Sequence, residues 1–307
     1  MPEPDRRYFE AEQAFLDSEG VDGPDHHVDL ARLGGRVRIR DVGEGPPVLF
    51  VPGVMTTGAV FAGLVGRLHG YRRLLLDRPG TGLSPLLSSP PTDLAVHERV
   101  GDHLVVDVLD GLGIDAAHVV STSLGGWYAF RGAAAHPERV LTLSGLAFQG
   151  GARIENAPLI MRLSMPGWMT PTRLRANRRM VRAMLKMAGM RSAIDTGRVS
   201  DEMFDWMVAL LRHTDTFGND SQYSPGPIDL RGPIEAVRHS PELLGKVTPP
   251  VRLIWGSDDL FGGESSAREF ASLLPDADLQ MVPGAGHAPW LDEPELVADA
   301  VRDHLRR

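Results

Sequence analysis

The chain has 307 residues, of which 42% are hydrophobic, and it carries a formal net charge of −8. Its length and apolar content suffice for a large buried core, whereas the acidic balance argues against nucleic acid or an anionic membrane as a partner. Because cysteine is absent, disulfides, thiolate nucleophiles and thiolate metal sites are excluded. We therefore expect a small-molecule partner.

The N-terminal segment is charged and lacks the apolar run of a signal peptide. No apolar stretch approaches the roughly 18 residues of a membrane span, so we expect no such span and a cytoplasmic location. Residues 3–19 are expected to form a short helix that ends at Gly20 to Pro24. We interpret residues 1–27 as an N-terminal extension.

Runs with the character of β-strands follow this extension. The first two, around residues 28–33 and 37–42, are separated by Gly34-Gly35, which predicts an antiparallel hairpin. Later runs are almost continuously apolar, as in a parallel sheet covered by helices, and lie at 48–51, 74–76, 119–120, 140–143 and 251–255. The last strand is expected at about 278–282. Helices are expected near 57–69, 92–112, 124–136, 264–274 and 294–306. This alternation predicts an α/β fold with a mostly parallel, doubly wound sheet.

The β signal disappears between about residues 150 and 245, where apolar residues follow helical spacing. We interpret 150–245 as a helical cap inserted into a core formed by 28–149 and 246–307. Nine of the 12 methionines lie in this cap, and methionine suits adaptable apolar surfaces. Ordinary packing onto the core explains them, and a lid lining an apolar substrate cavity is the alternative.

The segment His118-Val-Val-Ser-Thr-Ser123-Leu-Gly-Gly-Trp127 predicts a strand, a sharp turn at Ser123 and a helix. Such a turn needs small residues two positions before and after the nucleophile, and Ser121 and Gly125 meet this need. The turn would aim the Ser123 hydroxyl out of the sheet's C-terminal edge, beside the free N–H groups of the helix. We interpret Ser123 as a nucleophile and Ser121 as a structural turn residue.

A serine nucleophile needs a base within hydrogen-bond reach and a third group that orients the base. Asp259 follows the apolar run 251–255, at the carboxyl end of a strand, where sites of α/β proteins assemble. His287 follows the last expected strand, in a loop whose glycines let the backbone approach the same edge. We expect His287 to be the general base and Asp259 the orienting acid, with Asp258 as the alternative acid.

Four motifs in this order resemble the α/β-hydrolase family, from about Val28 to the C-terminus. They are the turn at Ser123, Asp77-Arg-Pro-Gly-Thr-Gly-Leu-Ser84, Trp255-Gly-Ser-Asp-Asp259 and Gly284-Ala-Gly-His287. The resemblance implies an α/β-hydrolase fold with 150–245 as the variable cap, and an oxyanion hole formed by the backbone N–H groups of Val54 and Leu124. Two positions depart from the family pattern, which usually has histidine at Pro52 and glycine at Ser121.

The resemblance implies a serine-dependent hydrolase that acts on an ester, thioester, lactone or related carbonyl substrate through an acyl-enzyme. The cap favours apolar or amphipathic substrates over peptides. The two departures leave open a lyase, dehydratase or acyltransferase of secondary metabolism, and a non-catalytic small-molecule-binding protein is a third interpretation. Because the sequence contains no histidine spacing of a helical zinc site, no dinucleotide fingerprint and no phosphate loop, we expect no metal and no cofactor.

Overall fold

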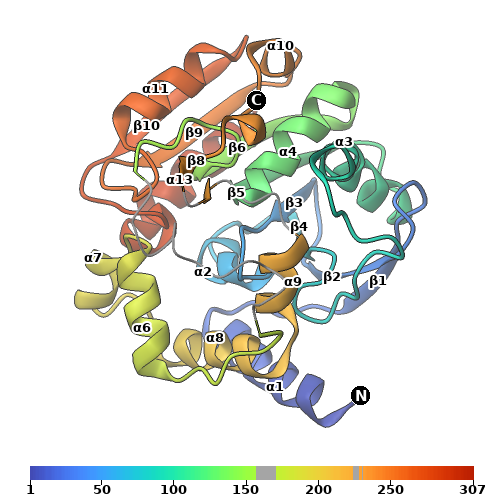
Figure 1. The fold of residues 1–307 in the computed structure, drawn as a ribbon, viewed down its shortest axis with the longest axis vertical. Coiled ribbons are helices and arrows are strands. Elements are labelled where there is room, and N and C mark those ends of the chain that lie inside the picture. The colour runs from blue at the N-terminus through green and yellow to red at the C-terminus, as the bar shows by residue number, and fades with distance from the viewer. Residues whose placement is uncertain (157–170, 224–227, 230) are drawn as a thin grey trace.

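The structure is a computed structural model of the chain and describes residues 1–156, 171–223, 228–229 and 231–307. Within these residues an eight-stranded sheet runs in the order β1-β2-β4-β3-β5-β6-β9-β10, with helices on both faces (Figure 1). The β1–β2 and β2–β4 pairs are antiparallel and the other neighbouring pairs are parallel. This arrangement confirms the predicted mostly parallel α/β sheet.

The strands agree with the predicted runs except at the first one. They are β1 (Asp25–Asp29), β2 (Arg36–Val42), β3 (Pro47–Val51), β4 (Arg72–Asp77), β5 (Ala117–Ser123), β6 (Val140–Gln149), β9 (Val251–Gly256) and β10 (Ala277–Val282). The predicted hairpin is present, but β1 begins inside the segment interpreted as an extension and ends earlier than expected. The chain already turns at Leu30, whose carbonyl accepts a hydrogen bond from Gly34 N at 2.8 Å.

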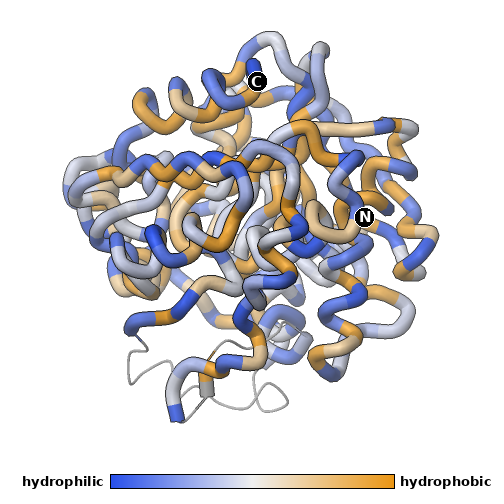
Figure 2. The backbone as a smooth tube through the Cα atoms, turned by 90° about the horizontal axis from the view of Figure 1, so that it is seen from above, coloured by the Kyte–Doolittle hydropathy of each residue, from blue (hydrophilic) through white to orange (hydrophobic). Residues whose placement is uncertain are grey.

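The helices of the core cover the two faces of the sheet. They are α2 (Ala62–Val65), α3 (Leu94–Gly111), α4 (Leu124–Ala135), α11 (Glu264–Ser272), α12 (Pro289–Asp292) and α13 (Pro294–His304). The helix expected over 57–69 is wrong in extent, since only a 3₁₀ turn at Gly58–Phe61 and the short α2 form there. Gly63 and Gly66 in this segment disfavour a longer helix. Figure 2 shows hydrophobic and hydrophilic residues alternating along helical turns at the edge of the molecule, as in helices with one face packed inward.

The N-terminal helix α1 (Glu3–Ser18) packs against helix α8 (Asp201–His213), which lies in the segment 150–245 that we continue to call the cap. Phe15 and Trp206 are buried and stack with ring centroids 5.2 Å apart. On the side of the core, Glu12 of α1 pairs with Arg38 of β2 at 2.5 Å, and both side chains are buried. The N-terminal helix therefore joins the cap to the sheet.

The insertion between β6 and β9 is mostly helical. Its helices are α6 (Arg178–Met187), α7 (Arg191–Asp195), α8, α9 (Thr216–Tyr223) and α10 (Pro241–Leu244). The expectation that no β structure occurs here is wrong, because β7 (Ile228–Asp229) and β8 (Gly232–Pro233) form an antiparallel ribbon. Two residues per strand are too few to show the alternation that marks a strand in sequence. In the described part of the chain, no helix has both the length and the hydropathy needed to cross a membrane.

The methionines of the cap mostly pack into the interior. Met203 and Met207 of α8 are buried, and Met180, Met184 and Met190 are partly buried against the same cluster, whereas Met187 is exposed. Met161, Met165 and Met169 lie outside the described residues. Packing therefore accounts for five of the six methionines of the cap that the structure describes.

Candidate active site

Ser123 lies where β5 ends and α4 begins, at the carboxyl edge of the sheet. Its φ of 51° and ψ of −125° are values that a residue with a side chain rarely adopts, so this turn stores strain. The surroundings leave no room for side chains, since a Cβ on Gly125 would lie 2.0 Å from Val51 O. A Cβ on Gly53 would lie 2.9 Å from Ser123 Cβ. The sharp turn expected from the sequence is thus present, with the β3 loop packed directly against it.

Ser121, which stands at the first glycine position of the turn, is fully buried. Its hydroxyl donates to Gln149 Oε1 at 3.2 Å, and Gln149 Nε2 donates to the carbonyl oxygens of Leu146 and Ala147. Gly126 makes space for this amide, because a Cβ there would lie 2.0 Å from Gln149 Oε1. Sequence reasoning missed Gln149, although a polar residue that closes a buried apolar run was an available signal.

Asp259 and His287 form a hydrogen-bonded pair. Asp259 Oδ2 accepts from His287 Nδ1 at 2.9 Å and from the Phe148 amide at 2.9 Å, and Oδ1 accepts from the Phe261 amide at 3.1 Å. The Asp259 side chain is fully buried, whereas Asp258 is exposed. Of the two candidate acids, the structure therefore pairs Asp259 with the histidine.

His287 is placed to act through its second nitrogen. With Nδ1 directed at Asp259, Nε2 is left as the basic atom of the ring. The ring packs against Phe261 with centroids 5.0 Å apart, and Phe261 lines the same cavity as Ser123. No hydrogen bond between Ser123 Oγ and His287 occurs among the described residues. The structure thus pairs His287 with Asp259, while Ser123 lines a cavity that Phe261, a neighbour of His287, also lines.

The loop that carries His287 is held by a buried carboxylate that sequence reasoning missed. Asp292 accepts from the Gly286 amide at 3.0 Å and from the Ala193 amide of α7 at 2.9 Å. Gly286 also touches the cap, since a Cβ there would lie 1.9 Å from Gly189 O. Burial raises the pKa of Asp292, and the two amide hydrogen bonds oppose this effect. The position of the histidine loop therefore depends on the cap.

Val54 and Leu124, the two expected oxyanion-hole residues, line the cavity together with Ser123. Neither backbone N–H group has a hydrogen-bond acceptor in the described ranges. Leu124 is the first residue of α4, where helix N–H groups are free and the helix dipole favours negative charge. Both amides are thus available to a ligand.

A buried ion pair holds the loop in which Pro52 replaces the expected histidine. Arg78 Nη2 donates to Gly53 O at 2.7 Å, and Asp220 Oδ2 accepts from the Met55 amide at 2.6 Å. The two side chains also pair with each other at 2.9 Å and are almost fully buried. Burial is the largest single effect and lowers the pKa of Arg78, but the charge and the hydrogen bond of Asp220, with the nearby Tyr128 and Asp77, together raise the pKa above its ordinary value. Sequence reasoning missed both roles, since Asp220 lies in a polar cap helix without a motif.

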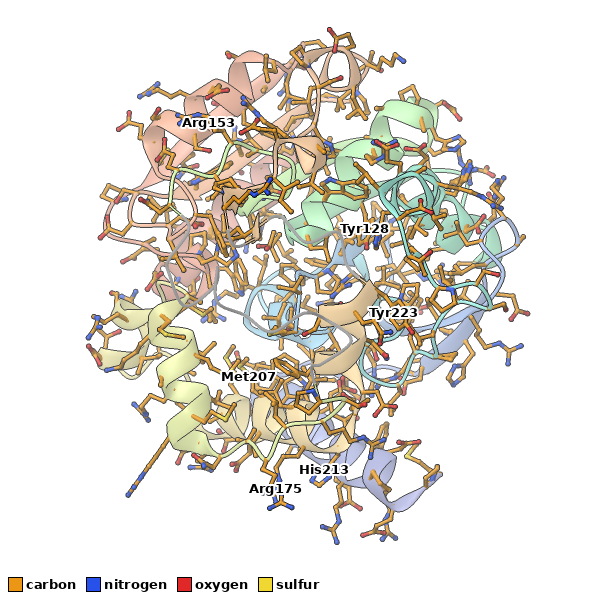
Figure 3. All side chains as sticks on the ribbon, in the orientation of Figure 1. Tyr128, Arg153, Arg175, Met207, His213 and Tyr223 are labelled. Atoms are coloured by element: carbon orange, nitrogen blue, oxygen red, sulfur yellow. The ribbon has the colours of Figure 1, made fainter. Side chains whose placement is uncertain are left out.

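The cavity beside Ser123 encloses about 120 Å³. Its lining is mainly apolar and includes Val54, Leu124, Trp127, Phe148, Ile154, Ile234, Val237 and Phe261. None of the six described methionines of the cap lines it, and Met207 lies far from Arg153, a lining residue (Figure 3). The idea that methionines line the cavity is therefore wrong for these six. Across the described parts of the chain, no group of three or more His, Asp or Glu side chains could hold a metal ion.

Charged side chains in the lining neutralise one another. Arg153 Nε donates to Glu269 at 2.5 Å, and Arg238 also donates to Glu269. The hydrogen bond from Arg153 is the main cause that lowers the pKa of Glu269. A third lining residue, Glu235, pairs with Arg238 at 3.6 Å. The cavity therefore has no surplus of positive charge.

His239 is buried behind the cavity, stacked on Trp127 with centroids 5.6 Å apart, and its Nε2 has no partner among the described residues. Burial lowers its pKa to about 3, whereas an unfolded histidine titrates near 6.5. The unfolded chain therefore binds this proton first, so stability is complete above about pH 6.5 and falls as the pH drops towards 3.

When the pH falls from 7 to 5, protonation of His239 in the unfolded chain should lower the free energy of unfolding of the wild type. In His239→Phe this loss should be smaller by about 2 kcal/mol. Urea unfolding at both pH values measures this difference. His27→Phe, which alters an exposed histidine, serves as the control and should keep the wild-type pH dependence. Equal losses in wild type and His239→Phe would show that the folded protein does not hold His239 neutral.

The chain is similar to known proteins over most of its length. The sequence model described as "Alpha/beta hydrolase family" matches residues 48–300. The pimeloyl-[acyl-carrier protein] methyl ester esterase of Chromobacterium violaceum is 29% identical over 87% of this chain and 97% of its own length. A 2-hydroxy-6-oxononadienedioate/2-hydroxy-6-oxononatrienedioate hydrolase of Burkholderia vietnamiensis is 27% identical over 78% of this chain and 77% of its own. The solved structure of carboxylesterase CesB from Bacillus subtilis is similar in fold, with a TM-score of 0.70, 18% identity and 99% of each chain covered.

Proposed function

The chain is a hydrolase of the α/β-hydrolase family, and from this membership we propose that it cleaves an uncharged, apolar ester through an acyl-enzyme on Ser123. The observation that carries the proposal is the surroundings of Ser123. The serine stands on a strained turn at an apolar cavity, beside the Val54 and Leu124 amides. The ring of His287, which pairs with Asp259, packs against Phe261, a residue that lines this cavity.

The chemistry follows from these groups. His287 Nε2 takes the proton of Ser123 Oγ as the oxygen attacks the ester carbonyl, and the Val54 and Leu124 amides bind the oxyanion. The imidazolium, stabilised by Asp259, then protonates the leaving alcohol, and water cleaves the acyl-enzyme by the same steps in reverse. This route requires a hydrogen bond between Ser123 Oγ and His287 Nε2. Catalytic hydrogen bonds of this kind often tighten only when the substrate is bound.

The electrostatics of the cavity favour an uncharged acyl group. One relative is named for a methyl ester and another for dioate substrates, which carry two carboxylates. A carboxylate buried in the cavity would need a cation, but both lining arginines donate to Glu269. An ester with an apolar acyl chain therefore fits better than a dioate with a scissile C–C bond.

The size of the acyl group can be tested at Ile234, which lines the cavity. We expect Ile234→Trp to raise KM about tenfold for a p-nitrophenyl octanoate, because the shortened cavity no longer buries the last two methylenes. The acetate ester should change by no more than about twofold. Ala236→Trp introduces the same side chain at an exposed neighbour outside the lining and is the matched control. If Ile234→Trp changed KM relative to the wild type by the same factor for both esters, the acyl chain would lie elsewhere.

The proposal as a whole is tested by turnover of a p-nitrophenyl ester panel from acetate to decanoate. We expect hydrolysis with a preference for one chain length. A folded wild-type protein that hydrolyses no ester, thioester or lactone would contradict the proposal. It would favour a lyase, a dehydratase or a binding protein on the same fold.

A further inference from the structure

An ion pair between the core and the cap lies directly behind the expected oxyanion hole. We propose that Arg78 and Asp220 are positioning residues that aim the Val54 amide at the substrate oxyanion, so that helix α9 of the cap helps to set the catalytic geometry. This inference rests on the proposed function, since the oxyanion hole matters only if Ser123 attacks a carbonyl.

The peptide unit between Gly53 and Val54 connects Arg78 to the expected oxyanion hole. A peptide unit is planar and trans, so its C=O and N–H groups point in opposite directions. Arg78 Nη2 holds Gly53 O at 2.7 Å. This hydrogen bond therefore turns the Val54 N–H away from Arg78, and Val54 itself lines the cavity with Ser123. The arginine controls the direction of a donor without touching the substrate.

The other side of Val54 is held by the cap. Asp220 Oδ2 accepts from the Met55 amide at 2.6 Å, and Met55 has an unfavourable φ of 55° that needs such support. Asp220 also accepts from Arg78 through both of its carboxylate oxygens, at 3.0 and 2.9 Å. The ion pair thus forms hydrogen bonds with the backbone of the residue before Val54 and of the residue after it.

Helix α9 brings Asp220 to this position and is itself fixed to the core by two further hydrogen bonds. Asn219 Nδ2 donates to Gly80 O at 2.8 Å, and Thr216 Oγ1 accepts from the Gly82 amide at 2.9 Å. Gly80 and Gly82 belong to the same loop as Arg78. A displacement of α9 would therefore move both partners of the pair.

A buried ion pair contributes little net free energy to the attachment of a cap. Both side chains are at least 96% buried. The free energy needed to remove the two charges from water offsets much of the free energy gained from their attraction. Two apolar side chains would hold the cap against the core as well, but they could not orient a peptide unit. The use of a directional, charged pair here is what positioning requires.

The first test is Asp220→Ala, assayed on an activated ester. We expect kcat to fall about tenfold or more, below the roughly 10²–10³-fold of losing a donor outright, with KM within about twofold. Asp107→Ala is the matched control, since Asp107 is a buried carboxylate that also accepts from backbone amides, those of Arg32 and Leu33, and from an arginine. Asp107 does not line the cavity beside Ser123, so its variant should lose stability but keep kcat.

A second test separates positioning from stability. Arg78→Met with Asp220→Leu removes both buried charges and should recover most of the melting temperature that Asp220→Ala loses. We expect kcat to remain low in this double variant. Binding of an alkyl trifluoromethyl ketone, whose adduct places an oxyanion in the hole, should weaken by the same factor as kcat, while the matching methyl ketone binds as before.

Recovery of kcat together with the melting temperature would overturn the inference, as would an Asp220→Ala variant as active as Asp107→Ala. In both cases the loss of turnover in Ser123→Ala would leave the proposed function intact. Full turnover in Ser123→Ala would instead overturn the proposed function, and the inference with it.

Discussion

Ser123→Ala is expected to lower kcat for an activated ester by on the order of 10⁴–10⁶-fold, because among the described residues that line the cavity only Ser123 carries a hydroxyl. The fold should be little affected. Ser123 Oγ makes no hydrogen bond within the described parts of the chain, and alanine faces the same backbone strain at φ 51°. Initial rates at saturating substrate and a thermal melt of each protein measure the two effects.

Ser144→Ala is the control for this change. Ser144 is fully buried in β6, next to β5, and its hydroxyl has no hydrogen-bond partner among the described residues. Its variant should keep kcat within about twofold. If Ser123→Ala retained activity comparable to that of Ser144→Ala, the acyl-enzyme mechanism on Ser123 would be wrong.

Asp259→Asn is expected to lower kcat by about 10⁴-fold with little change in the fold. The carboxylate accepts from His287 Nδ1 and from two backbone amides, so an asparagine must turn an N–H group towards one of these donors. It would then favour the imidazole tautomer that carries the proton on Nε2, which cannot accept the serine proton. The imidazolium would also lose its stabilising charge.

Asp258→Asn provides the matched control, because it makes the same change on the adjacent, exposed residue. Its kcat should stay within about twofold of the wild type. The comparison decides between the two candidate acids directly: a large loss in Asp258→Asn with activity preserved in Asp259→Asn would reverse the assignment.

Local patterns explain how much of the fold could be predicted. Buried parallel strands have continuously apolar centres, so β3, β4, β5 and β9 could be located from the sequence. The short ribbon of β7 and β8 and the broken helix over 57–69 could not. Their form depends on tertiary packing and on glycines whose effect differs between contexts.

The same distinction applies to the site. Ser123, Asp259 and His287 could be proposed because each stands in a loop whose small residues have a local geometric purpose. Arg78 and Asp220 lie 142 positions apart. Arg78 stands in the motif of residues 77–84, but nothing in this motif or near Asp220 indicates that the two side chains pair. The role of Gln149 at Ser121 likewise depends on a contact between two strands. Such long-range polar pairs follow from the fold and have no sequence period of their own.

Covalent labelling tests most directly whether Ser123 is the nucleophile. A fluorophosphonate probe forms a stable bond to an activated serine, and peptide mass spectrometry locates the modified residue. We expect one adduct on Ser123 in the wild type, none in Ser123→Ala, and greatly slowed labelling in Asp259→Asn. An ester-hydrolysing wild type that carries no adduct on Ser123, or carries it on another side chain, would contradict the account.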